Sequence, residues 1–141
     1  MTSAKVIWTD HERYVAEASS RHAIVMDTAR EKTANSPMEL VLIALCGCTA
    51  SDVVGILRKK REAFTSLEVS AEGARAQGYP AVYAEIKLKY RVGGKVSAKA
   101  MEDAVRLSKE KYCSATIMLA RTAEITYEIR ITDGDRVSEV A

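Results

Sequence analysis

The sequence predicts an α+β fold in which a mostly antiparallel sheet packs on one long, buried central helix. Three observations support this prediction. Segments that alternate apolar and polar residues occur near both ends and in the middle of the chain. One almost unbroken apolar stretch occupies residues 40–57. Hairpin connections outnumber crossovers. The length of 141 residues fits a single domain over 1–141.

The N-terminal third is predicted to be strands. Residues 4–9, 14–19 and 22–27 each resemble a short strand, and the polar clusters between them resemble turns. Residues 28–35 form a polar loop. This segment therefore contributes strands to the predicted, mostly antiparallel sheet.

A strong helix start follows the loop. Ser36 can cap the helix, Pro37 suits its first position, and Glu39 completes a capping box. We expect a helix from residue 37 to about residue 62. Residues 40–50 are apolar or small on all sides, which predicts that other elements enclose this helix.

The remaining chain continues the α+β pattern. Residues 66–76 and 81–92 alternate like strands, and a turn at residues 78–80 joins them. Ser97 then caps a helix that runs to about residue 109, and residues 112–120 form a third helical segment. The sequence leaves open whether these two segments are separate. Residues 122–132 form a last strand, and residues 133–141 are predicted to be a loose polar tail.

Composition narrows the function. The chain carries 21 basic and 19 acidic residues, so its net charge of +2 gives no reason to expect nucleic acid or a membrane as partner. The N-terminus does not resemble a secretion signal. Three cysteines, an odd number, argue against a structural disulfide framework and favour a cytoplasmic location.

The cysteines are the candidate chemical groups. Cys46 and Cys48 point about 200° apart on one helix, so they cannot chelate one metal ion. The sequence has two histidines and no Cys-x-x-Cys motif, so we expect no zinc site. Redox chemistry is the other option, because thiolates react with peroxides and disulfides.

The three cysteines have different predicted surroundings. Cys48 shares its helix face with Ser51 and Asp52, so this face is predicted to open on a cleft, whereas the face of Cys46 resembles core. Cys113 lies near the start of a helical segment, where a thiolate is stabilised. Each cysteine also fits the role of a small buried apolar residue. Nothing in the spacing shows that Cys48 and Cys113 meet.

Two motifs resemble the OsmC/Ohr family. The first is the helix start Ser36-Pro37-Met38-Glu39-Leu40 followed by Leu45-Cys46-Gly47-Cys48-Thr49, which places a cysteine eleven positions after the proline. The second is Lys109-Glu110-Lys111-Tyr112-Cys113-Ser114. The motifs and their flanking elements cover nearly the whole chain, and the Ser-Pro-Met-Glu start is most similar to the YhfA-like branch.

The resemblance implies a thiol-dependent peroxidase. Cys48 is the expected nucleophile that attacks an organic hydroperoxide, and Cys113 the expected partner that forms a disulfide with it. An external dithiol of the lipoyl type, or another thiol, restores the pair, and no bound cofactor is implied. The family also implies an intertwined homodimer with sites at the subunit interface.

The activating residues depart from the family pattern. Met38 stands where the family glutamate usually follows the proline, and Glu39 is rotated about 100° from that position. Arg13 lies where the family arginine is expected, with Arg21 and Arg30 as rivals, and His22 is a further supporting candidate. Two alternative functions stay open: a non-catalytic module that binds a small apolar ligand, and a redox sensor. Cys46 is expected to be dispensable.

Overall fold

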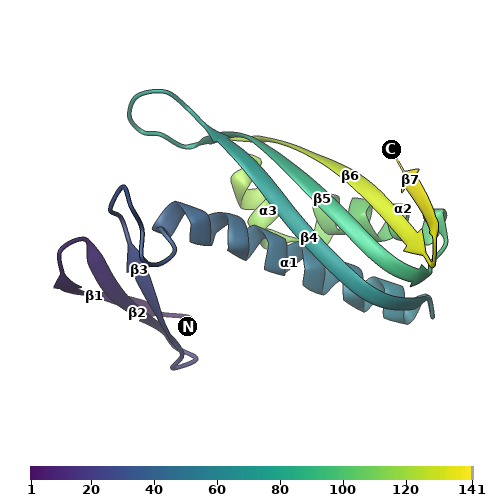
Figure 1. Cartoon of the computed structure of the whole chain (residues 1–141), viewed down its shortest axis with the longest axis horizontal. Coiled ribbons are helices and arrows are strands. Elements are labelled where there is room, and N and C mark those ends of the chain that lie inside the picture. The colour runs from purple at the N-terminus through teal and green to yellow at the C-terminus, as the bar shows by residue number, and fades with distance from the viewer. Residues whose placement is uncertain (141) are drawn as a thin grey trace. The chain divides into compact units, whose positions relative to one another are not determined.

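The computed structural model describes residues 1–140 and confirms the predicted α+β class. Contacts group the chain into two units, residues 1–41 and the residues from 42 onward. Figure 1 shows the elements of each unit along the chain. The helix that carries Cys48 begins at the end of the first unit and continues into the second.

The first unit contains a three-stranded antiparallel sheet. Its strands are β1 (Ala4–Asp10), β2 (Arg13–Ala18) and β3 (Ala23–Asp27), in that order. The buried Asp27 carboxylate ends β3 and accepts hydrogen bonds from the backbone of Ala29 at 2.8 Å and of Thr33 at 2.9 Å. The Thr33 hydroxyl also donates to Asp27 at 2.6 Å and is the main cause that lowers the Asp27 pKa to about 2. An ionised Asp27 therefore orders the predicted polar loop.

The predicted capping box opens helix α1 (Pro37–Lys59). The Glu39 N–H donates to Ser36 Oγ at 3.2 Å, and the Ser36 N–H donates to Glu39 Oε1 at 3.1 Å. These paired bonds satisfy two backbone donors that the first helical turn would otherwise leave unpaired.

Burial of α1 is restricted to one stripe in the single chain. The stripe repeats every four residues and consists of Leu45, Thr49, Val53 and Leu57. Ile43 on another side remains 52% exposed, so the helix is not enclosed all round as its composition indicated. By length and composition alone, α1 is long and apolar enough to cross a membrane. Its fully buried stripe is the pattern of a core helix.

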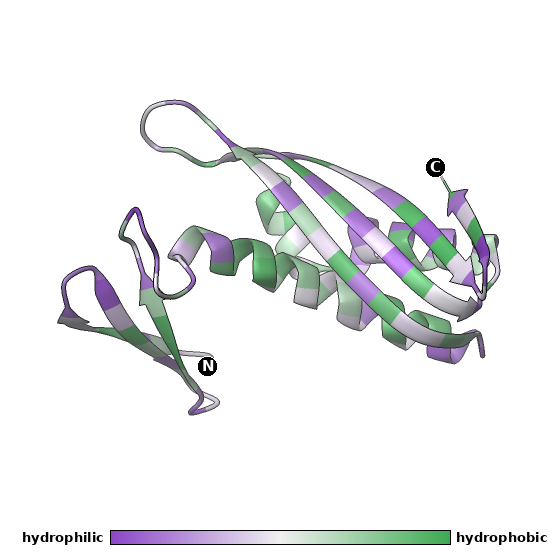
Figure 2. Ribbon diagram, in the orientation of Figure 1, coloured by the Kyte–Doolittle hydropathy of each residue, from purple (hydrophilic) through white to green (hydrophobic). Residues whose placement is uncertain are grey.

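The second unit contains most of α1, a four-stranded sheet and a helical crossover. Its strands are β4 (Ala63–Arg75), β5 (Tyr83–Lys95), β6 (Glu124–Asp133) and β7 (Arg136–Val140), paired in that order. Only the β5–β6 pair is parallel, so the sheet is mostly antiparallel as predicted. Hydropathy alternates along the strands (Figure 2), and the inward residues of β5 are Ile86, Leu88, Tyr90 and Val92.

A helical crossover joins β5 to β6. It begins with α2 (Ala98–Leu107), whose buried residues are Ala100, Met101, Ala104 and Val105. A single π-helical turn, η1 (Ser108–Tyr112), follows directly, and α3 (Ser114–Leu119) completes the crossover. Between η1 and α3, Cys113 has extended dihedrals, φ −76° and ψ 101°. This break answers the open question, because the last two helical segments are separate.

The prediction of a loose tail from residue 133 is wrong for the described residues. Residues 136–140 form β7, which pairs with β6, while residue 141 lies outside the described part. Gly134 turns the hairpin with a φ of +60°, and Arg130 pairs with Glu139 at 2.7 Å. The two-residue turn is Gly134-Asp135, a hairpin signal that the polar composition of the segment hid.

Candidate functional site

Cys48 and Cys113 meet in the second unit. Cys48 lies on α1, and its side chain is within hydrogen-bonding reach of the Cys113 thiol. Both cysteines are free thiols in the structure. The fold therefore brings together two residues that are separated by 64 intervening residues and whose contact no spacing pattern could reveal.

The two thiols differ in access to solvent. Cys113 is fully buried, with 0% exposure, whereas Cys48 is half-buried. A molecule from solvent can therefore reach Cys48 more directly than Cys113. This difference matters for any ordered chemistry between them, because the first reactant must meet an accessible sulfur.

The Cys113 sulfur caps helix α3. Its Sγ accepts a hydrogen bond from the Thr116 backbone N–H at 3.4 Å. Burial raises the pKa of Cys113, the Thr116 side chain and backbone act to lower it, and the nearby Cys48 thiol raises it further. The Thr116 hydroxyl lies beside this sulfur but makes no hydrogen bond of regular geometry within residues 1–140. Cys113 is thus held as a neutral thiol in a dry environment.

Cys46 has different surroundings. It lines an apolar groove of about 460 Å³ between α1 and β4, with Leu42, Ile43, Gly47, Ala50, Val69 and Ala71. Burial raises the pKa of Cys46. Its side of the helix therefore differs from that of Cys48, as the 200° separation predicts.

A second groove runs along the helix face that carries Cys48. Ser51, Asp52, Gly55 and Lys59 follow Cys48 at three- and four-residue steps, so they share its face. The groove has a volume of about 450 Å³, and its other walls are Ile56, Lys60, Leu107 and Tyr112. Tyr112 directly precedes Cys113, so both cysteines flank residues of this groove. The lining of this groove begins at Ser51, three residues after Cys48, and its use by Cys48 stays a prediction.

Three buried hydroxyl groups lie beside the cysteine pair. Thr49 Oγ1 is 2.7 Å from the Tyr90 hydroxyl and 2.8 Å from Ser108 Oγ. Ser108 donates in turn to the Asp52 carboxylate at 2.9 Å. Burial is the main cause that raises the pKa of Tyr90 to about 12, so this hydroxyl stays protonated. Removing one member of such a buried cluster costs about 1–3 kcal/mol of stability.

Sequence reasoning missed this hydroxyl cluster. The predicted strand over residues 81–92 contains Tyr90 and the predicted helix to residue 109 contains Ser108, but neither pattern singles out these hydroxyl groups. One signal was available, because Thr49 directly follows Cys48 and is polar within a mostly apolar stretch. Its partners lie 41 and 59 residues away and depend on the tertiary fold.

The predicted supporting residues occupy the first unit. Arg13 on β2 pairs with Asp10, with 2.6 Å between Nη2 and Oδ2. Arg21 and His22 are exposed in the connection between β2 and β3, and Arg21 has a positive φ of 63°. Glu39 serves in the capping box, and its hydrogen bonds to the Ser36 backbone and side chain lower its pKa. A role for any of these residues beside the cysteines stays a prediction.

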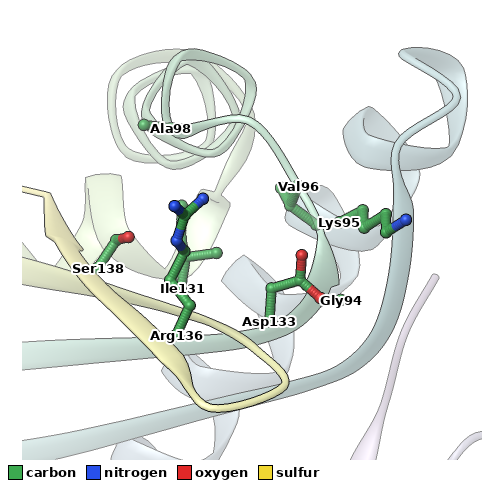
Figure 3. A pocket seen from close by; sticks show the side chains of 8 residues that line it. All are labelled: Gly94, Lys95, Val96, Ala98, Ile131, Asp133, Arg136 and Ser138. Atoms are coloured by element: carbon green, nitrogen blue, oxygen red, sulfur yellow. The ribbon is translucent and has the colours of Figure 1, made fainter.

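A polar hollow of about 300 Å³ lies elsewhere in the second unit. Figure 3 shows its lining residues, which come from the segment around Lys95 and from β6 and β7 and include Asp133 and Arg136. None of these residues is a cysteine or histidine. The thiol chemistry considered for this chain therefore does not involve this hollow.

The fold and the cysteine pair agree with what comparison with known proteins shows. Residues 29–128 match the model of the OsmC-like protein family, and the chain belongs to this family. Within the family it is similar to the protein YhfA of Escherichia coli K12, with 38% identity over 129 residues, 91% of this chain and 96% of YhfA. The predicted family and branch are both confirmed.

Two solved structures place the fold. A hypothetical protein from Aquifex aeolicus has a TM-score of 0.87 at 29% identity, over 96% of this chain and 98% of its own. An organic hydroperoxide resistance protein OsmC from Legionella pneumophila has a TM-score of 0.71 over 94% of this chain and 96% of its own. Its identity is 14%, so this second likeness concerns the fold alone.

Proposed function

We propose that this protein is a thiol-dependent peroxidase that reduces organic hydroperoxides through Cys48 and Cys113. The observation that carries the proposal is the pairing of an accessible thiol with a fully buried one inside hydrogen-bonding reach. Membership in the OsmC family supports the assignment, as does the hydroperoxide resistance named for a structural neighbour.

The first step takes place at Cys48. Its thiolate attacks the outer oxygen of the hydroperoxide, so a sulfur–oxygen bond forms while the oxygen–oxygen bond breaks. The alkoxide takes up a proton and leaves as an alcohol, and Cys48 becomes a sulfenic acid. The groove beyond Cys48 provides apolar wall from Ile56, Leu107 and Tyr112 for the alkyl part of the substrate.

The second step joins the two cysteines. The Cys113 sulfur attacks the Cys48 sulfenic acid, a disulfide forms, and the hydroxyl leaves as water with the Cys113 proton. Because Cys113 is already a neighbour of Cys48 and is shielded from solvent, this condensation competes well with attack by outside thiols. An external dithiol then reduces the disulfide and returns both thiols.

The activating shell differs from the family pattern at one position. Met38 follows Pro37 where a glutamate usually stands, and Glu39 is already engaged in the capping box. An arginine of the first unit, with Arg13 the first candidate, is the proposed partner of the Cys48 thiolate. A weaker rate, or a substrate other than simple alkyl hydroperoxides, is the expected consequence.

Peroxide consumption tests the proposed function. Purified protein is given cumene hydroperoxide or hydrogen peroxide, with dithiothreitol or dihydrolipoamide as reductant. We expect many turnovers and a preference for the organic peroxide, because the groove offers apolar contacts. A single oxidation without turnover would instead identify a redox sensor. No oxidation, with thiols that still titrate as reduced, would identify a ligand-binding module.

We also infer that a second copy of the chain covers the exposed apolar residues of the first unit. Large apolar side chains stand open on its three strands, among them Ile7 at 56%, Trp8 at 64% and Val25 at 52% exposure. Such a concentration of exposed apolar groups is typical of an interface. Sedimentation should give twice the chain mass of 15.4 kDa, and Trp8→Glu should shift the protein toward the monomer. A wild-type chain that sediments as a monomer at micromolar concentration contradicts this inference.

A further inference from the structure

Two hydrogen bonds connect the segments that carry the cysteines. Thr49, the residue after Cys48, lies 2.8 Å through its Oγ1 from Ser108 Oγ. The backbone carbonyl of the same Ser108 accepts from the Cys113 N–H at 2.8 Å, which is the bond that closes the π-helical turn. Ser108 therefore contacts Thr49, the residue after Cys48, with its side chain, and it contacts the backbone of Cys113 with its carbonyl group.

The donors in this chain of hydroxyl hydrogen bonds can be assigned because the chain ends at the Asp52 carboxylate. Asp52 accepts from Ser108, so the Ser108 proton is committed to the carboxylate. A serine hydroxyl has one proton, so Ser108 must accept from Thr49, and Thr49 must accept from Tyr90. Each hydroxyl donates once along the path Tyr90, Thr49, Ser108, Asp52. A chain with one defined direction, ending on a carboxylate, fixes its members more firmly than isolated neutral bonds.

The three hydroxyl groups of this hydrogen-bonded chain are buried, which keeps their positions fixed. Thr49 and Ser108 are 0% exposed and Tyr90 is 1% exposed, so water does not replace these bonds. The turn that Ser108 anchors is a π-helical turn, a geometry that is rare and often found at functional sites. In a regular α-helix, one residue fewer in the turn would rotate the following residue by about 100°.

The geometry points to Ser108 as a positioning residue, which, with Thr49, fixes the π-helical turn so that Cys113 is held against Cys48. Within residues 1–140 the Ser108 side chain bonds to Thr49 and Asp52 and to neither thiol, so Ser108 acts through the backbone of Cys113 and the helix of Cys48. This inference rests on the proposed function, which gives the cysteine pair its chemistry. A purely structural role for the hydroxyl chain is the alternative.

The equilibrium between the Cys48–Cys113 disulfide and the two thiols can distinguish a positioning role of Ser108 from a purely stabilising role, and its measurement needs no peroxide. In glutathione redox buffers, the ratio of Cys48–Cys113 disulfide to dithiol gives the effective concentration of one thiol at the other. Measurements in a Cys46→Ala background remove the third thiol, and acid quenching with alkylation and mass spectrometry counts each form. We expect Ser108→Ala to lower this effective concentration by about tenfold or more, because the anchor of the turn is lost.

Matched variants distinguish the hydroxyl from its packing. Thr49→Val removes the hydroxyl with little change in shape and should lower the effective concentration as Ser108→Ala does. Thr49→Ser keeps the hydroxyl and should leave the value within about twofold of the parent. Ser97→Ala removes the N-cap of α2, whose Oγ accepts from the Ala100 N–H at 3.1 Å, outside the hydroxyl chain. This control should lose stability and keep the effective concentration.

The outcomes decide between the ideas. A loss in Ser108→Ala and Thr49→Val, with Thr49→Ser and Ser97→Ala unchanged, supports positioning. Equal effective concentrations in all variants overturn the positioning role and leave the cysteine pair intact. A parent protein that forms no Cys48–Cys113 disulfide in any buffer overturns the positioning role together with the proposed function. If Ser108→Ala does not fold, the Thr49→Val and Thr49→Ser pair decides the matter.

Discussion

Cys48→Ser should abolish peroxide consumption, lowering turnover by about three orders of magnitude or more. A serine hydroxyl at this half-buried position is a far weaker nucleophile than a thiolate and cannot form a sulfenic acid. The substitution is nearly isosteric, so the fold should persist. The measurement is the initial rate with cumene hydroperoxide and dithiothreitol, compared with wild type at equal protein concentration.

Cys46→Ala is the matched control for this experiment. Cys46 lies on the same helix two residues earlier, but it lines a separate apolar groove, and burial raises its pKa. We expect its replacement to leave the rate nearly unchanged. Full activity in Cys48→Ser would remove the assignment of the nucleophile. Loss of activity in a folded Cys46→Ala protein would show that the chemistry occurs on the other side of α1.

Cys113→Ser should trap the oxidised state of Cys48. Without a neighbouring thiol, the sulfenic acid formed on Cys48 cannot condense and persists long enough to react with dimedone. Serine is also a favoured N-cap, so helix α3 should keep the bond that Cys113 accepts from the Thr116 N–H. Mass spectrometry should find the dimedone adduct on Cys48 in most Cys113→Ser chains and in few wild-type chains.

Cys46→Ala is also the control for the Cys113→Ser experiment. Cys46→Ala should behave like wild type and accumulate little adduct, because its resolving pair is intact. An absence of adduct on Cys48 in peroxide-treated Cys113→Ser would contradict the role of Cys113 as the partner thiol. An adduct on Cys46 instead would transfer the first step to that residue.

Local chemistry made part of the structure predictable. The start of α1 was correctly placed because a capping box is written in four consecutive residues, Ser36 to Glu39. Strands β4, β5 and β6 of the second unit were found from their alternation, which continues through the buried positions of β5. In each case the signal lies within a short window of the sequence, so no tertiary contact was needed to read it.

Other features depend on contacts between distant segments. The π-helical turn at Ser108–Tyr112 has no signature in its own residues, and its anchor is a threonine 59 positions earlier. The family resemblance supplied Cys113 as the partner of Cys48, and the structure brings the two side chains together. Strand β7 was missed because it lies on an edge of the sheet, where burial imposes no alternation, and its two valines, Val137 and Val140, are three residues apart.

The long sequence separation of the adjacent thiols has a thermodynamic consequence. A disulfide between Cys48 and Cys113 would close a loop with 64 intervening residues, and chain entropy alone would then favour the folded form by about 4 kcal/mol. Folding and oxidation form a closed thermodynamic cycle. The free energy by which the native fold favours the disulfide therefore equals the free energy by which the disulfide stabilises the fold against unfolding. The oxidised protein would therefore have a higher free energy of unfolding than the reduced protein. Reduction by a dithiol would remove this added stability.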